Sequence, residues 1–133
     1  MTRRPRSNRI TGAYRRRPYH YGFTILAALA AAGLYSFLYL VTTWTPYAVW
    51  LVALSITTGA MFLVDKMLAK IGSARIPELV LHIFTFAGGF PGQWAGRLVA
   101  RHKINGREHP LFRIVLIISI FFHLVLISYW FLQ

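Results

Sequence analysis

The chain has 133 residues, enough for one domain, and 56% of them are hydrophobic, with a mean hydropathy of +0.51. Fifteen Lys and Arg oppose three Asp and Glu, for a formal net charge of +12, and there is no cysteine. So few charged side chains exclude an ordinary soluble domain, and the cysteine count excludes disulfides, thiolate catalysis and cysteine-ligated zinc. Long apolar blocks instead predict an all-α polytopic membrane protein.

Residues 1–21 form a basic arm without apolar periodicity. Its seven arginines are Arg3, Arg4, Arg6, Arg9, Arg15, Arg16 and Arg17. We expect this arm to be disordered or surface-bound. It is not typical of a signal peptide, because it is long and no small-residue cleavage site follows the next apolar run. The positive-inside rule places the arm, and with it the N-terminus, in the cytoplasm.

Two uncharged runs follow the arm, and together with the rest of the chain they form a predicted helical membrane domain over residues 22–133. The first run covers residues 22–44 and the second covers residues 46–64, each long enough to cross a bilayer. Pro46 is well placed at the start of a helix, and Trp44 and Tyr47 mark one interface. The two runs therefore predict an antiparallel hairpin with almost no exposed loop.

A third apolar run covers residues 76–96, after a polar connector at residues 65–75. Four residues that weaken a helix interrupt it, namely Gly88, Gly89, Pro91 and Gly92. The run predicts either a broken, re-entrant segment beside three transmembrane helices or a fourth complete span, because its length also fits one crossing. The last span covers residues 111–132 and ends in an aromatic belt at Tyr129 and Trp130.

The distribution of basic residues bears on this choice. A fourth span would leave ten basic residues inside, seven in the arm and three in the connector, and five outside between residues 97 and 113. A re-entrant segment would place all fifteen inside, as the positive-inside rule favours. The lengths favour the fourth span, so both alternatives stay open.

Glu78 and His82 stand four residues apart and would share one face of a helix. A metal site would need His102 or Asp65 to complete the set. The simpler interpretation is a carboxylate near the positive end of a helix dipole and a hydrogen-bonded imidazole. His123, in the middle of the last span, is expected to form a hydrogen bond to a neighbouring helix.

Charged residues at the ends of the runs have two interpretations. Asp65, Lys66, Arg75 and Glu78 predict an ion-pair network that anchors the protein at the inner interface. The functional alternative is an anionic-ligand site, in which a phosphate is held by basic residues. Its candidates are Arg75, Arg101, His102 and Lys103.

Several short motifs occur in a fixed order: Asp65-Lys66, Arg75-Ile76-Pro77-Glu78, Leu81-His82, Gly88-Gly89, Pro91-Gly92 and His102-Lys103. In this order they resemble a family of small bacterial membrane proteins known as domain of unknown function twelve-ninety-four, some members of which are fused to a cold-shock domain. The resemblance covers residues 46–132, so the arm and the first span look like an addition to the part of the chain that resembles the family. It implies a location in the bacterial inner membrane and supplies no activity.

The sequence favours a non-enzymatic binding module over an enzyme, because no nucleophile constellation is present, and it indicates no cofactor. Its basic cytoplasmic face predicts binding to anionic lipid headgroups, nucleic acid or a protein partner. The alternative is a membrane-embedded enzyme or lipid-handling protein with a Glu/His/Arg site at the cytoplasmic interface. A homo-oligomer or a larger membrane complex is also compatible with the sequence.

Overall fold

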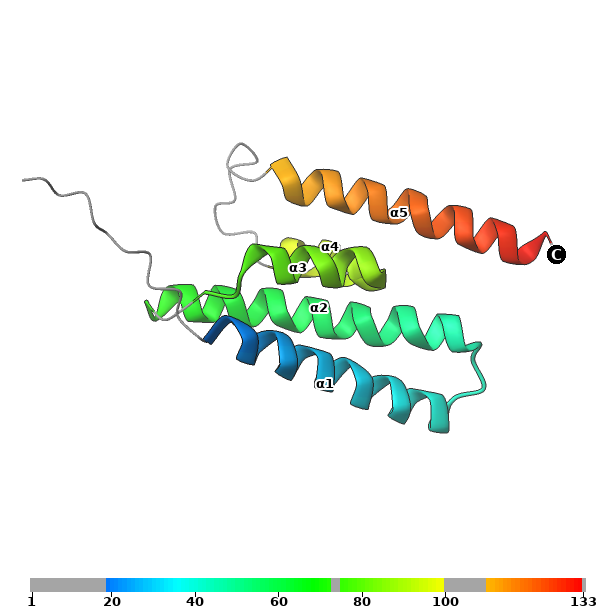
Figure 1. Ribbon diagram of the computed structural model, residues 1–133, viewed down its shortest axis with the longest axis horizontal. Helices are drawn as coiled ribbons and strands as arrows, with labels where there is room; N and C mark the ends of the chain where they lie inside the picture. The colour runs from blue at the N-terminus through cyan, green and yellow to red at the C-terminus, as the bar shows by residue number, and fades with distance from the viewer. Residues whose placement is uncertain (1–18, 73–74, 100–109, 133) are drawn as a thin grey trace, which may run out of the picture.

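The computed structural model describes residues 19–72, 75–99 and 110–132, and these residues form helices without any strand (Figure 1). The elements are α1 (Tyr19–Val41), α2 (Pro46–Lys70), α3 (Glu78–Phe84), the π-helical turn η1 (Thr85–Gly89), α4 (Phe90–Val99) and α5 (Pro110–Phe131). Three of them, α1, α2 and α5, are long and apolar enough to cross a membrane. The predicted all-α fold is therefore confirmed.

The first two helices form the predicted hairpin, but their ends differ from the expected ones. Helix α1 ends at Val41 rather than near residue 44, because residues 42–45 make the connection to α2. Thr45 caps α2 by accepting a hydrogen bond from the backbone N–H of Ala48 at 3.4 Å, and Pro46 begins the helix. Side-chain capping and the fixed φ of proline thus set this boundary.

Helix α2 is longer than predicted. It continues to Lys70 through residues that the sequence placed in the polar connector. Lys, Met, Leu and Ala are all good helix formers, and a lysine near the end of a helix interacts favourably with its dipole. The connector proper is therefore short, and residues 73–74 within it lie outside the described residues.

The third apolar run is broken, as predicted, and the break reverses the chain. At its start the backbone N–H of Ile76 bonds to Asp65 of α2, and near its middle the carbonyl of Ala87 lies against Trp50 of α2. Helix α3 therefore runs antiparallel to α2. Gly88, with φ of 134°, adopts a conformation that favours glycine, and the antiparallel segment ends there.

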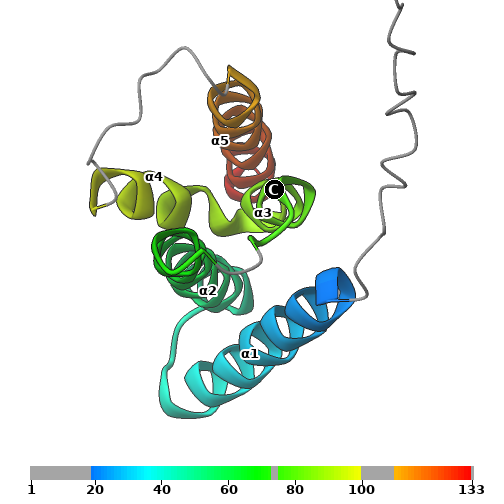
Figure 2. The ribbon, with the colours of Figure 1, turned by 90° about the vertical axis from the view of Figure 1, so that its left-hand side faces the viewer.

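Helix α4 then runs back toward the end at which α3 began (Figures 1 and 2). Close approaches to α2 show the return, because Gly92 lies against the backbone of Ser55 and Gly96 lies against the side chain of Phe62, two turns further along α2. A Cβ atom on Gly92 would overlap the Ser55 carbonyl oxygen, so only glycine permits this approach. The structure thus has the re-entrant form, which we call the α3–α4 hairpin.

Helix α5 covers the α3–α4 hairpin on the side away from α1 (Figure 2). The ring of Phe112 lies near its start and packs against the ring of His82, with 4.3 Å between the ring centroids and 47° between the ring planes. About two turns further on, the Ser119 hydroxyl donates to the carbonyl of Thr85 at 2.9 Å. The broken backbone is therefore enclosed by protein between α2 and α5, as irregular backbone at membrane depth requires.

Candidate functional site

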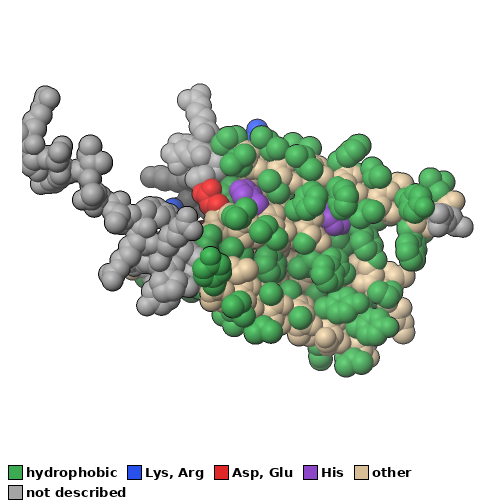
Figure 3. All heavy atoms as spheres, viewed as in Figure 1, with side chains coloured by type: hydrophobic (Ala, Val, Ile, Leu, Met, Phe, Trp, Pro, Cys, Tyr) green, Lys and Arg blue, Asp and Glu red, His purple; other side chains and the backbone are tan. Residues whose placement is uncertain are grey.

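Within the described part of the chain, all charged side chains gather at one end of the helices. They are Asp65, Lys66, Lys70, Arg75, Glu78, Arg97 and Arg113. These residues occupy the end of α2, the start of α3, the end of α4 and the start of α5. Figure 3 shows acidic side chains in red at this end, next to a histidine in purple. With five basic and two acidic groups, this charged end has a net charge of +3 (5 − 2).

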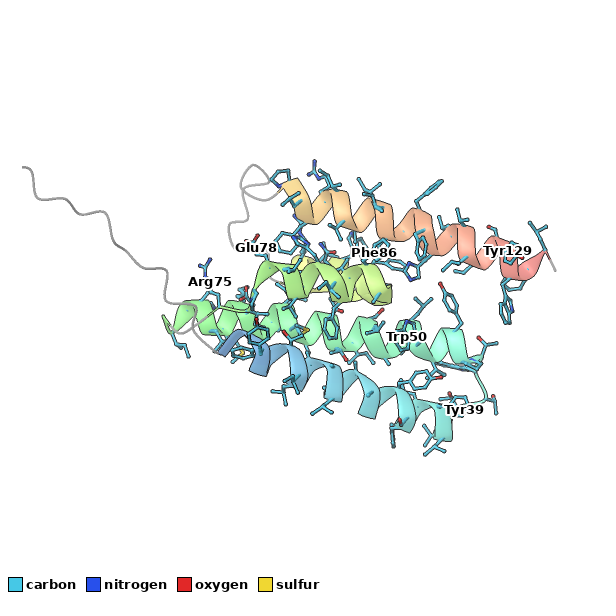
Figure 4. The ribbon with its side chains drawn as sticks, in the orientation of Figure 1. Tyr39, Trp50, Arg75, Glu78, Phe86 and Tyr129 are labelled. Carbon is cyan, nitrogen blue, oxygen red and sulfur yellow. The ribbon has the colours of Figure 1, made fainter. Side chains whose placement is uncertain are left out.

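The opposite end is aromatic, and none of its described residues is charged. Tyr39, Tyr129 and Trp130 lie there, together with the connection that contains Trp44. Figure 4 shows Tyr39 and Tyr129 at this end and Arg75 and Glu78 at the other. Trp and Tyr prefer the boundary between hydrocarbon and water, so the predicted aromatic belts at the ends of the first and last spans share one level.

The re-entrant segment is attached to α2 by a predicted site residue. Asp65 accepts a hydrogen bond from the backbone N–H of Ile76 at 2.9 Å through its Oδ1. Ile76 is buried and stands two residues before the start of α3, where the N–H groups lack intrahelical partners. Asp65 thus fixes the segment that carries Arg75 and Glu78, both of which are exposed.

His82 lies one turn deeper than Glu78 on α3, as their spacing predicted. Its two ring nitrogens are buried and have no hydrogen-bond partner among the described residues. The ring packs against the tilted ring of Phe112 of α5. The imidazole therefore packs against an aromatic ring and does not form the expected hydrogen bond to a described residue.

Gln93 is a buried polar residue that the sequence analysis did not single out. It is fully buried on α4, its Nε2 donates to the carbonyl of Phe112 at 3.0 Å, and its Oε1 has no partner in the described chain. His82 and Gln93 therefore approach Phe112 from two helices. Arg97 stands one turn after Gln93, and Glu78 one turn before His82, so His82 and Gln93 each lie one turn away from a residue of the charged end.

The break exposes backbone carbonyls, and side chains of the neighbouring helices bond to them. The Ala87 carbonyl would accept from residue 91 in an α-helix, but Pro91 has no N–H, and the Trp50 indole donates to it at 2.9 Å instead. Ser119 bonds to the Thr85 carbonyl. The position of Pro91 in the sequence predicts that the Ala87 carbonyl lacks its usual backbone donor. Nothing in the sequence identifies Trp50 as the donor that replaces it.

His123 differs from the prediction. It is buried in α5, and its Nδ1 lies 2.9 Å from the carbonyl of Ser119 on the same helix, to which it donates. The ring also contacts Phe90 at 5.3 Å and Tyr47 at 6.3 Å between centroids. The expected hydrogen bond to a neighbouring helix was wrong, because the carbonyl one turn earlier was already in reach.

Three of the predicted site residues, Arg101, His102 and Lys103, lie outside the described residues, and so does the basic arm up to residue 18. Within the described residues no three His, Cys, Asp or Glu side chains come close enough to hold a metal ion. The metal set completed by His102 lies in part outside them. Four predicted residues do share one end of the fold, namely Asp65, Lys66, Arg75 and Glu78.

No curated protein and no solved structure matches the chain. A family model described as a protein of unknown function, DUF1294, matches residues 55–109. That segment begins inside α2 and ends just before α5, so it contains the whole α3–α4 hairpin and is narrower than the expected 46–132. It leaves out α1 and the basic arm, which the sequence analysis described as an addition. The predicted resemblance to the DUF1294 family is thus confirmed over the segment that contains the re-entrant hairpin.

Proposed function

We propose that this chain is a membrane-embedded binding module whose charged end holds the headgroups of anionic phospholipids. The observation that supports this function is the gathering of five basic and two acidic side chains at one end of the helices, opposite an aromatic end. Each Lys or Arg near an anionic membrane surface contributes about 1 kcal/mol of attraction. A net positive surface at headgroup level therefore selects anionic over zwitterionic lipid.

The same asymmetry gives the orientation that we propose. Basic residues near span ends favour the cytoplasmic side, so the charged end faces the cytoplasm and the protein lies in the bacterial inner membrane. The arm precedes α1 at this end, and its seven arginines add to the positive charge of the sequence there. The basic residues between positions 100 and 109 connect α4 and α5, both of which have an end at the same level.

The exposure of the basic groups fits contact with headgroups. Lys70, Arg75 and Arg113 are exposed, whereas Lys66 and Arg97 are half-buried. Long basic side chains in such positions cover apolar surface with their stems and keep the charged group at the interface. Arginine also binds a phosphate through two parallel hydrogen bonds, so Arg75 and Arg97 are the residues that we expect to contribute most.

Thermal unfolding of the purified protein in detergent, with phosphatidylglycerol or phosphatidylcholine added, tests this function. We expect phosphatidylglycerol to raise the melting temperature and high salt to reduce that increase. The double variant Arg75→Gln/Arg97→Gln should lose about 2 kcal/mol of binding, or roughly 30-fold in the apparent dissociation constant. The matched control Glu78→Gln changes one charge at the same end and should leave the preference intact.

Equal stabilisation by the two lipids in the unaltered protein would contradict the proposed function. Retention of RNA in a salt-sensitive manner without any preference for phosphatidylglycerol would replace headgroup binding by nucleic-acid binding.

A second candidate function is a lipid-handling site. The observation that favours it is the pair His82 and Gln93, which bury polar atoms without partners beneath Glu78 and Arg97. Unpartnered buried polar atoms cost about 1–3 kcal/mol each, and a bound polar group is one arrangement that would satisfy them. Mass spectrometry of the lipid recovered from the same assay discriminates the two functions, because only a lipid-handling protein returns it chemically altered.

A further inference from the structure

An apolar groove of about 320 Å³ lies between α1 and α2. Three alanines line it, Ala27 and Ala30 from α1 and Ala60 from α2, and their short side chains leave space between the two helices. For comparison, an engineered cavity of about 150 Å³ lined by apolar side chains stays dry and binds benzene. The groove is therefore large enough for a segment of hydrocarbon.

The wall of the groove offers nothing to a polar ligand. Thr57 is its one polar residue, and the Thr57 hydroxyl already donates to the carbonyl of Ala53 at 2.9 Å. Water or a polar solute in the groove would lose hydrogen bonds without replacement. The groove thus selects an apolar occupant, and its surroundings in a bilayer are acyl chains.

The groove begins at the charged end and follows one leaflet. Ile76 lines it at that end, beside the exposed Arg75, and along α2 it extends from Val64 to Ile56. Those eight residue steps correspond to ~12 Å of helix, close to the ~15 Å that is half of a typical hydrocarbon core. A guanidinium at headgroup level and an apolar channel as deep as one leaflet match the two parts of a single phospholipid.

A second apolar groove, of about 250 Å³, lies beside α1 and is lined by Ala32, Trp50 and Ala87, among others. Trp50 stands near the start of α2, toward the aromatic end, and no basic residue lines this groove. No basic residue lines either groove, but the first is lined by Ile76, which directly follows the exposed Arg75 in the chain. The second is therefore a built-in control for unspecific contact with lipid.

Helix α1 supplies one wall of the first groove and lies outside residues 55–109, the segment matched by the DUF1294 model. The α1 wall of the groove thus lies outside the matched segment, whereas the α2 wall and Ile76 lie within it. From these observations we infer that the groove between α1 and α2 binds one acyl chain of an anionic phospholipid whose phosphate lies at Arg75. This inference rests on the proposed function and names a single bound lipid within it.

The test uses phosphatidylglycerol with a photoreactive diazirine in one acyl chain, added to the full-length protein in liposomes of phosphatidylcholine. After irradiation, mass spectrometry locates the crosslinked residues. We expect crosslinks to concentrate on the groove residues of α1 and α2, and unlabelled phosphatidylglycerol to compete at least fivefold better than phosphatidylcholine. Ala30→Leu fills the groove and should reduce these crosslinks severalfold.

Ala32→Leu is the matched control, because it makes the same substitution two residues away on the same helix but lines the other groove. It should leave the crosslinks in place. Crosslinks spread evenly over the exposed faces of the three long helices, or equal competition by the two lipids, would overturn the inference. If phosphatidylglycerol still stabilises the protein against heat in that case, the headgroup function stands and only the acyl-chain groove is lost.

Discussion

The hydrogen bond between Trp50 and Ala87 compensates for the backbone donor that Pro91 lacks. Pro91 cannot donate to the carbonyl one turn before it, and that carbonyl belongs to Ala87. The Trp50 indole N–H fills the missing role from α2 at 2.9 Å. In a hydrocarbon environment an unpartnered carbonyl costs several kcal/mol, so this bond stabilises the reversal of the chain as well as the contact between two elements.

Replacing Trp50 by phenylalanine should therefore destabilise the fold. Trp50→Phe keeps an aromatic ring but removes the donor, and we expect a loss of about 1–3 kcal/mol in unfolding by a denaturing detergent, followed by far-ultraviolet circular dichroism. Trp94→Phe is the control, because Trp94 is 61% exposed and stands on α4 away from the break. Equal stability of the two variants would mean that the indole bond contributes nothing measurable.

At the scale of the helices, the close approach of α4 to α2 depends on glycine. Gly89, at the end of η1, and Gly92 and Gly96, on α4, stand three and four residues apart, and an added Cβ at any of them would meet α2. The spacing that lets two helices approach in this way can be read in a sequence. Which helix approaches cannot, because the same spacing is compatible with packing against α1, α2 or α5.

Gly92→Ala should loosen this contact. The new methyl group would overlap the Ser55 carbonyl oxygen, so we expect a loss of about 1–3 kcal/mol from overpacking, measured in the same unfolding assay. Gly33→Ala is the control, because no atom lies within 4 Å of a Cβ at that position of α1, and alanine favours a helix over glycine by about 1 kcal/mol. A Gly92→Ala variant as stable as Gly33→Ala would contradict the packing that we describe.

The elements were largely predictable, and their contacts were not. The uncharged runs, the proline at the start of α2 and the glycine-rich break are local signals, and the structure has a helix or a reversal at each of them. The extension of α2 to Lys70 is not predictable from the uncharged run alone, because charged residues mark where a span ends and do not show whether the helix continues past it. Gln93 was missed because one amide in an apolar run gives no indication that it is buried.

For the whole molecule, the decisive property is that the charged residues share one end. The sequence predicted two distributions of basic residues and could not choose between them, because length and charge pointed in opposite directions. Contacts between separate segments of the chain distinguish the two distributions. The Ile76 N–H donates to the Asp65 carboxylate, and the Gln93 amide donates to the carbonyl of Phe112. Both ends of the re-entrant segment are thereby held at the same level.

Single cysteines introduced into this cysteine-free chain test the arrangement. Ile71→Cys and Leu111→Cys mark the two sides of the re-entrant segment, and Leu132→Cys marks the aromatic end; all three positions are exposed. In intact cells treated with a membrane-impermeant thiol reagent, we expect labelling at position 132 only, and after lysis at all three. Labelling of position 111 but not 71 in intact cells would mean that the third run crosses completely.

The hydrogen bonds around the break also constrain the order in which the protein is assembled. Helices α3 and α4 have seven and ten residues, too few for either to cross a bilayer alone, and their freed carbonyls find donors on α2 and α5. During synthesis α5 emerges after the hairpin, so the hairpin lacks the Ser119 donor until that helix has been made. The re-entrant segment should therefore leave the water interface and pack between its neighbours only after α5 inserts.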